Sequence, residues 1–193
     1  MGLLFPVILG SVRSNRQGIK AARYIIDKIA ARGDEPIMVD PCETKLPLLD
    51  RMYKEYPKGE APPLLEELAD LFRRADRFVI VSAEYNQCVP PALKNTLDYF
   101  LEEFFWRPSA ILSYSAGRFG GVRAAVALRT ILSEMGMPSV PSVLSIPTIG
   151  SALTEEGTAT EKWIDQAAGR FLDEFVWYVT ALKRQREAEG TPY

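Results

Sequence analysis

The chain of 193 residues contains no histidine. Without an imidazole it cannot form a Ser-His-Asp triad, a histidine-containing zinc site or a histidine general base. No side chain is predicted to act as a catalytic group, and no metal site is expected. If the protein is an enzyme, its chemistry is therefore carried out by other groups or by a bound cofactor.

Cysteine, excess positive charge and long apolar runs are also scarce. The two cysteines, Cys42 and Cys88, are too few for a disulfide framework and suit a reducing compartment. A net charge of −2 gives no broad positive field for nucleic acid. No apolar run is long enough to span a bilayer, and the apolar stretch 1–9 lacks a basic leader. We expect a cytoplasmic protein that binds neither nucleic acid nor a membrane.

Short apolar runs alternate with segments of helical periodicity. Strands are predicted at 3–9, 36–39, 78–81, 110–112 and 143–146, and helices over 19–29 (ended by Gly33), 64–75, 91–104, 122–135 and 160–186. This alternation predicts an α/β fold whose parallel sheet is covered by helices on both faces. We expect one domain over 1–193, with a long loop or lid over 40–63 and a frayed tail over 187–193.

The segment GSVRSNRQG, residues 10–18, joins the first predicted strand to the first predicted helix. A small, hydroxyl-rich turn at a helix N-terminus offers backbone amides and a positive dipole to an anion, and Arg13 and Arg16 add charge. The segment matches neither the Walker P-loop nor the G-x-G-x-x-G dinucleotide motif. It favours a phosphate monoester site, although a plain helix start with two solvated arginines remains an alternative.

Two more loops follow predicted strands and should meet the first at one edge of the sheet. AEYNQCVPPALKN, residues 83–95, supplies Tyr85 and Asn86, and SAGRFGGVRAA, residues 115–125, supplies glycine amides that approach a flat ligand closely. Ser115 is not a hydrolase nucleophile, because position 113 is serine rather than glycine and histidine is absent. Each loop alone is compatible with a rim aromatic or a tight turn, but their convergence favours a ligand site.

These three segments resemble the NADPH-dependent FMN reductase family, which comprises flavodoxin-like quinone, azo-dye and chromate reductases, over roughly residues 5–180. The resemblance implies a three-layer flavodoxin-like fold with a five-stranded parallel sheet of order 2-1-3-4-5. It also implies bound FMN, NADPH or NADH as reductant, and a homodimer or homotetramer with active sites at the subunit interface.

The resemblance further implies a role for each loop. Ser11, Arg13, Asn15, Arg16, Gln17 and Gly18 would hold the FMN phosphate; Glu84, Tyr85 and Asn86 would line the isoalloxazine; Ser115, Gly117, Gly120 and Gly121 would contact its pyrimidine end. The chain departs from the family at Ala83, where proline is usual and whose loop is expected to be looser, and at Cys88, where serine is common.

The function implied is transfer of hydride from NAD(P)H through FMN to quinones, flavins or other small acceptors by a ping-pong mechanism. Two alternatives remain: an electron carrier of the flavodoxin kind, and a flavin-sensing binding protein without NAD(P)H turnover. Flavodoxins usually bind the phosphate without arginines, so Arg13 and Arg16 favour the enzyme.

Overall fold

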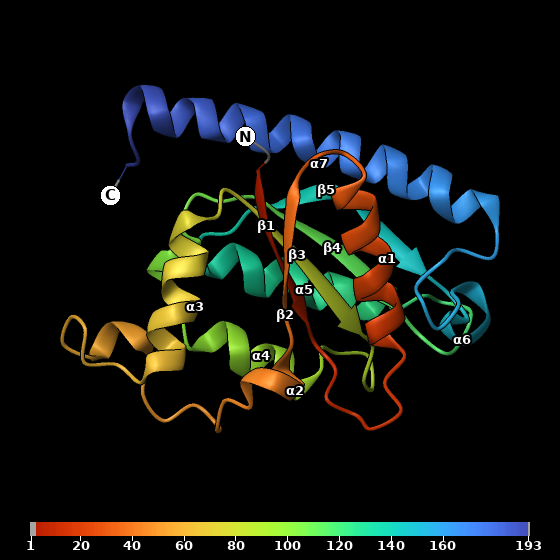
Figure 1. Ribbon diagram of the computed structural model, residues 1–193, viewed down its shortest axis with the longest axis horizontal. Coiled ribbons are helices and arrows are strands. Elements are labelled where there is room, and N and C mark those ends of the chain that lie inside the picture. The colour runs from red at the N-terminus through yellow and green to blue at the C-terminus, as the bar shows by residue number, and fades with distance from the viewer. Residues whose placement is uncertain (1–2, 193) are drawn as a thin grey trace.

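The computed structural model describes residues 3–192 and contains a five-stranded sheet. The strands are β1 (Leu4–Leu9), β2 (Glu35–Val39), β3 (Phe78–Ala83), β4 (Ser109–Tyr114) and β5 (Ser139–Ile146). All neighbouring strands are parallel, in the order β2-β1-β3-β4-β5 (Figure 1). The expected strand order and all-parallel pairing are confirmed.

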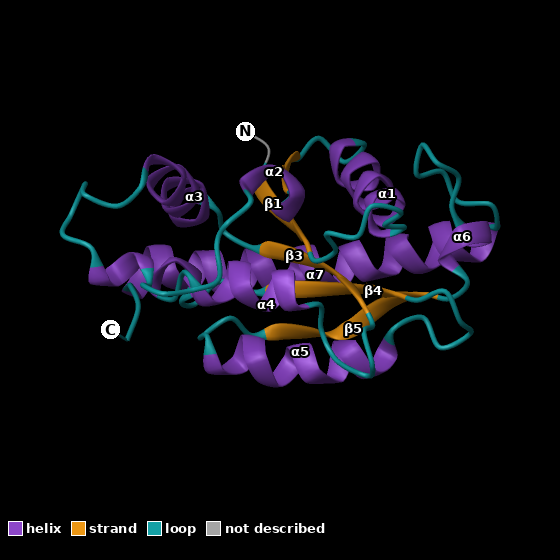
Figure 2. Cartoon of the chain, turned by 90° about the horizontal axis from the view of Figure 1, so that it is seen from below, coloured by secondary structure: helices purple, strands orange, loops and turns teal. Residues whose placement is uncertain are grey.

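Helices enclose this sheet, as Figure 2 shows. They are α1 (Gly18–Ala30), α2 (Pro41–Thr44), α3 (Pro63–Arg74), α4 (Pro91–Asp98), α5 (Val122–Glu134), α6 (Ile149–Ala152) and α7 (Lys162–Glu189), with short 3-10 turns η1 (Tyr53–Glu55) and η2 (Glu102–Phe104). Among residues 3–192, no helix is long and apolar enough to cross a membrane.

Two hydrophobic cores lie on opposite faces of the sheet, because successive strand residues point to opposite sides. Val7 and Leu9 of β1 belong to one cluster, with residues of α1 and α7. Ile8, between them, belongs to the other cluster, with residues of α3, α4 and α5. The sheet is therefore covered on both faces, as expected, and its loops at the carboxyl ends of the strands are left to form a site.

The helix predicted over 91–104 is wrong in its second half. The α-helix ends at Asp98, and Leu101 leaves the helical region with φ −147° and ψ −66° before η2. This break brings the Phe100 and Phe104 rings to 5.0 Å and 5.2 Å from the Phe72 ring of α3. The burial of both rings against α3 outweighs the continuation of the helix.

The tail and the segment 40–63 are also more structured than predicted. Helix α7 continues to Glu189, so the expected fraying is wrong at residues 187–189, and Tyr193 lies outside the described residues. Segment 40–63 contains α2 and η1 and is fastened to α4. The Asn95 amide accepts from Leu49 N (2.9 Å) and donates to Pro47 O (2.7 Å), which holds this segment in place.

Candidate functional site

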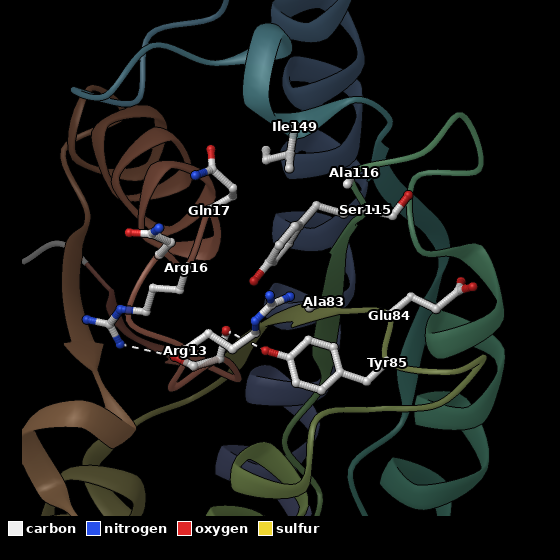
Figure 3. A pocket seen from close by; sticks show the side chains of 12 residues that line it. Arg13, Arg16, Gln17, Ala83, Glu84, Tyr85, Ser115, Ala116 and Ile149 are labelled. Carbon is white, nitrogen blue, oxygen red and sulfur yellow. Dashed lines mark hydrogen bonds between the residues drawn. The ribbon is translucent and has the colours of Figure 1, made fainter.

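A pocket of about 140 Å³ opens at the carboxyl ends of β1, β3 and β4 (Figure 3). It is lined by eight of the predicted site residues: Ser11, Arg13, Asn15, Arg16, Gln17, Glu84, Tyr85 and Ser115. The loops after three separate strands thus meet at one edge of the sheet. Ala83, Tyr114, Ala116 and Ile149 complete the lining, whereas the predicted residues Gly18, Asn86, Gly117, Gly120 and Gly121 lie outside it.

The loop after β1 leaves most of its backbone amides available. From Val12 to Gly18, only Arg16 N donates a hydrogen bond to another described residue, to Arg13 O at 3.1 Å. Helix α1 begins at Gly18, so the positive end of its dipole adjoins the same loop. Unpaired amides next to a helix N-terminus form a site for an anion.

The two arginines of this loop have different environments. Arg16 is bound in a bidentate ion pair, with Nη1 and Nη2 each 2.5 Å from a carboxylate oxygen of Asp40. The hydrogen bond to Asp40 is the main reason that the pKa of Arg16 is raised above its ordinary value. Asp40 also caps α2 by accepting from Cys42 N at 2.9 Å, and Arg16 donates to Ser11 O at 3.1 Å. The charge of Arg16 is therefore already compensated, and it connects the loop after β1 to α2.

Arg13, in contrast, is exposed and makes no hydrogen bond or ion pair through its guanidinium with the rest of residues 3–192. Figure 3 shows its side chain diverging from that of Arg16. Of the two arginines predicted to bind phosphate, only Arg13 has an uncommitted positive charge at the pocket.

The loop after β3 places Tyr85 against the loop after β1. Tyr85 Oη and Ser11 Oγ lie 2.8 Å apart and share a hydrogen bond. Tyr85 and Cys88 exchange two backbone hydrogen bonds of 2.9 and 3.0 Å around a two-residue turn, in which Asn86 and Gln87 have φ of 49° and 67°. This is the backbone of a tight hairpin turn, so Asn86 occupies an exposed tip instead of the pocket wall.

Glu84 forms part of the pocket wall, but its carboxylate is turned toward α5. Its Oε1 lies 2.7 Å from Arg123 Nε, and its Oε2 accepts from Arg123 N at 3.1 Å. The carboxylate thus satisfies a backbone amide in the first turn of α5 and sits near the positive end of that helix dipole. Both carboxylate oxygens of Glu84 are therefore bonded to Arg123, and these bonds hold the loop after β3 against α5.

The predicted glycines after β4 are explained by close packing of the backbone. Gly121 has φ +79°, and a Cβ there would lie 2.7 Å from Tyr114 O. Gly120 has φ +61° and packs against Ser145, and its carbonyl accepts from Ser113 Oγ at 2.8 Å. Gly117 faces open space, and its carbonyl accepts from Ser115 Oγ and Thr148 N. These glycines shape the loop without lining the pocket.

Sequence reasoning missed Tyr114, although its position at the carboxyl end of a predicted strand, one residue before Ser115, was a usable signal. The residue is 4% exposed, and its hydroxyl has no hydrogen-bond partner among residues 3–192. Burial raises the pKa of the Tyr114 phenol well above its ordinary value, and the nearby Ser11 side chain and the positive charges of Arg16 and Arg13 only partly offset this effect. Gln17 Oε1 is a second buried atom of the pocket without a partner.

The five-stranded parallel sheet of order β2-β1-β3-β4-β5, with a pocket at its strand ends, defines a flavodoxin-like fold. The same fold is present in FerB, described as a flavoenzyme NAD(P)H:(acceptor) oxidoreductase from Paracoccus denitrificans. The two structures agree with a TM-score of 0.73 at 20% identity, over 93% of this chain and 98% of FerB.

The sequence itself gives the family. The model of the NADPH-dependent FMN reductase family matches residues 5–150, and the chain belongs to this family. It is 32% identical to a quinone reductase of Pseudomonas putida KT2440 over 146 residues, which cover 68% of this chain and 70% of the relative. It is 34% identical to a quinone reductase of Escherichia coli K12 over 129 residues, 65% and 66% of the two chains. The protein is thus an oxidoreductase, and its family implies FMN as cofactor with NAD(P)H as reductant.

Proposed function

We propose that this protein binds FMN with its phosphate on the loop after β1 and catalyses reduction of quinones or other small acceptors by NAD(P)H. The single observation that carries the proposal is the set of uncommitted donors in the pocket: the Arg13 guanidinium, the amides of 12–18 apart from Arg16 N, and the Tyr114 hydroxyl. A cluster of uncommitted donors fits a multiply charged oxyanion such as a phosphate monoester.

The other predicted residues take supporting roles in this proposal. Arg16 and Ser11 hold the loop in shape, through Asp40 and Tyr85 respectively, so that its amides stay together. Gln17 Oε1, a buried acceptor, is suited to a hydroxyl of the ribityl chain. Tyr85, Ser115 and the backbone near Ala116 form the wall for the ring. Glu84, Asn86 and the glycines set the conformation of the two loops that carry this wall.

FMN, when bound, would supply the two-electron redox chemistry that links the nicotinamide to the acceptor. The chain provides position and polarity: donors at the phosphate end and an open pocket at which NAD(P)H and the acceptor bind in turn. The relatives named quinone reductase favour a quinone as the acceptor.

We also propose that the protein is a homodimer or homotetramer. An apolar groove lies beside the pocket and includes Val12 and Leu48, whose exposed fractions are 48% and 84%. Large exposed apolar side chains next to a site favour a protein contact there. Light scattering of the purified protein should give twice or four times the mass of one chain. A mass equal to that of one chain would contradict the proposed oligomer.

Steady-state kinetics test the enzymatic proposal. Oxidation of NADH or NADPH by the FMN-loaded protein is followed at several fixed concentrations of a benzoquinone. Parallel double-reciprocal lines are expected for a ping-pong mechanism, and intersecting lines would contradict it. Tight FMN binding without turnover would instead favour the electron carrier or the flavin sensor.

A further inference from the structure

The hydroxyl of Tyr114 occupies an unusual position for a buried polar atom. Tyr114 ends β4, is 4% exposed, and its Oη makes no hydrogen bond with any described residue. Burial of a hydroxyl without a partner costs stability, so such atoms are rare unless a ligand satisfies them. Tyr114 lines the pocket after β1, β3 and β4, where a ligand could supply the partner.

The sequence leaves space for this hydroxyl at the start of α1. A Cβ built on Gly18 would lie 2.1 Å from Tyr114 Oη and 2.8 Å from Tyr114 Cζ. The phenol therefore reaches from the end of β4 to the first residue of α1, where a side chain at position 18 would displace it. The absence of a side chain at Gly18 puts the hydroxyl beside the helix N-terminus, where an anion is favoured.

The chemistry of the surrounding groups defines the partner. The Tyr114 phenol, like any tyrosine with an ordinary pKa, is protonated at neutral pH and can donate a hydrogen bond, and burial only raises its pKa further. Tyr85 Oη and Ser11 Oγ already share a hydrogen bond, whereas the Arg13 guanidinium and the free loop amides are donors only. Gln17 Oε1 is the other buried pocket atom without a partner, but it makes no hydrogen bond with Tyr114, so the acceptor for the hydroxyl is expected from a ligand, and the donors around it favour a ligand with several oxygens. A phosphate monoester fulfils this requirement better than the alcohol of an unphosphorylated flavin.

We propose that Tyr114 Oη donates a hydrogen bond to the phosphate of the bound flavin nucleotide and makes the site select FMN over riboflavin. The proposal rests on the function proposed above. The selectivity for FMN lowers the stability of the stripped protein, because the Tyr114 hydroxyl is then buried without a hydrogen-bond partner. Removal of the hydroxyl should therefore weaken FMN binding without weakening the fold.

The experiment compares Tyr114→Phe with Tyr85→Phe, since each variant removes one phenolic hydroxyl from the same pocket. FMN and riboflavin are titrated into the stripped proteins, and thermal unfolding of each stripped protein is recorded. Tyr114→Phe should raise the Kd for FMN about 10- to 100-fold, as expected for a lost hydrogen bond to a charged group, and leave the Kd for riboflavin unchanged. Its Tm should equal or exceed that of the parent. Tyr85→Phe should lower the Tm, because Ser11 loses its partner.

Three outcomes would overturn the inference while leaving the proposed function intact. These are unchanged FMN affinity in Tyr114→Phe, an equal loss of FMN and riboflavin affinity, and a lower Tm or failure to fold. Each of the last two would mean that the hydroxyl supports the structure instead of the phosphate. If the parent itself binds no FMN, the proposed function fails as well, so the two failures are distinguishable.

Discussion

The loops after β1 and after β4 reach the same edge of the sheet, but they differ in how their polar groups are used. After β1, the amides of 12–18 apart from Arg16 N, together with the Arg13 guanidinium, make no bonds within the described chain. After β4, Gly117 O accepts from Ser115 Oγ, and Gly120 O accepts from the hydroxyl of Ser113, a residue of the strand itself. The serine hydroxyls at the loop after β4 thus bond to carbonyls of that loop, whereas its amides 116–121, like most of those of 12–18, donate to no described residue. Both are rich in small residues, so composition alone does not distinguish a binding loop from a structural one.

The largest effect expected from this contrast is on Gly121. Gly121→Ala places a Cβ 2.7 Å from Tyr114 O at φ +79°, so both strain and collision oppose folding. The free energy of unfolding of the stripped protein should fall by about 2–4 kcal/mol in urea titrations. Gly117→Ala is the matched control, because no heavy atom lies within 4 Å of its Cβ position. Equal stability of the two variants would remove the structural role assigned to Gly121.

The second largest effect is expected at the ion pair between Arg16 and Asp40, which holds the loop after β1 in shape. Arg16→Met leaves Asp40, whose side chain is 2% exposed, without its counter-charge. Breaking a pair with one buried partner should lower the free energy of unfolding by about 2–3 kcal/mol, measured in urea without flavin. The control is Asp40→Asn, which retains an acceptor for Cys42 N and should cost less. Unaltered stability of Arg16→Met would indicate that Arg16 is free to bind phosphate.

Arg13 should behave in the opposite way to Arg16. Arg13→Met removes a charge that the fold does not use, so stability without flavin should change by less than about 0.5 kcal/mol. FMN affinity, measured by fluorescence quenching, should fall by about 1.5–3 kcal/mol, the range for a hydrogen bond to a charged group. Riboflavin serves as the ligand control. Equal losses for FMN and riboflavin would show that Arg13 does not act on the phosphate.

The smallest effect is expected at Glu84, in the wall between the two loops. Glu84→Gln removes the ion pair with Arg123, whose side chain is 46% exposed, but retains an oxygen for Arg123 N. Stability should fall by no more than about 1 kcal/mol, because, although the Glu84 side chain is only 8% exposed, the substitution leaves no buried charge behind and the partner Arg123 stays solvated. Chemical denaturation of Glu84→Gln and Arg123→Gln should give similar small losses. A loss several times larger would mean that the pair is more strongly desolvated than its exposure indicates.

The fold could be predicted from the sequence because short apolar runs alternate strictly with segments of helical periodicity along the chain. The break after Asp98 was not, since it depends on packing of Phe100 and Phe104 against Phe72, which local pattern does not reveal. Tertiary contacts of this kind override helical propensity.

The candidate site was predictable as a set of three loops, but the use of each side chain was not. Arg13 and Arg16 are equivalent in the sequence, and only the fold brings Asp40, 24 residues from Arg16, to neutralise one of them. From the sequence, Tyr114 is expected to be a core residue of a strand. That its hydroxyl lacks a partner becomes known only when the hydrogen bonds of every buried polar atom are determined in the structure.

Titration of FMN and riboflavin into the stripped parent protein, followed by calorimetry in the same buffer, tests the central claim directly. The uncommitted donors at the phosphate end predict that FMN binds at least about 100-fold more tightly than riboflavin, equivalent to one or two hydrogen bonds to a charged group. Equal affinities, or no heat of binding with FMN, would contradict the assignment of this loop to a flavin phosphate.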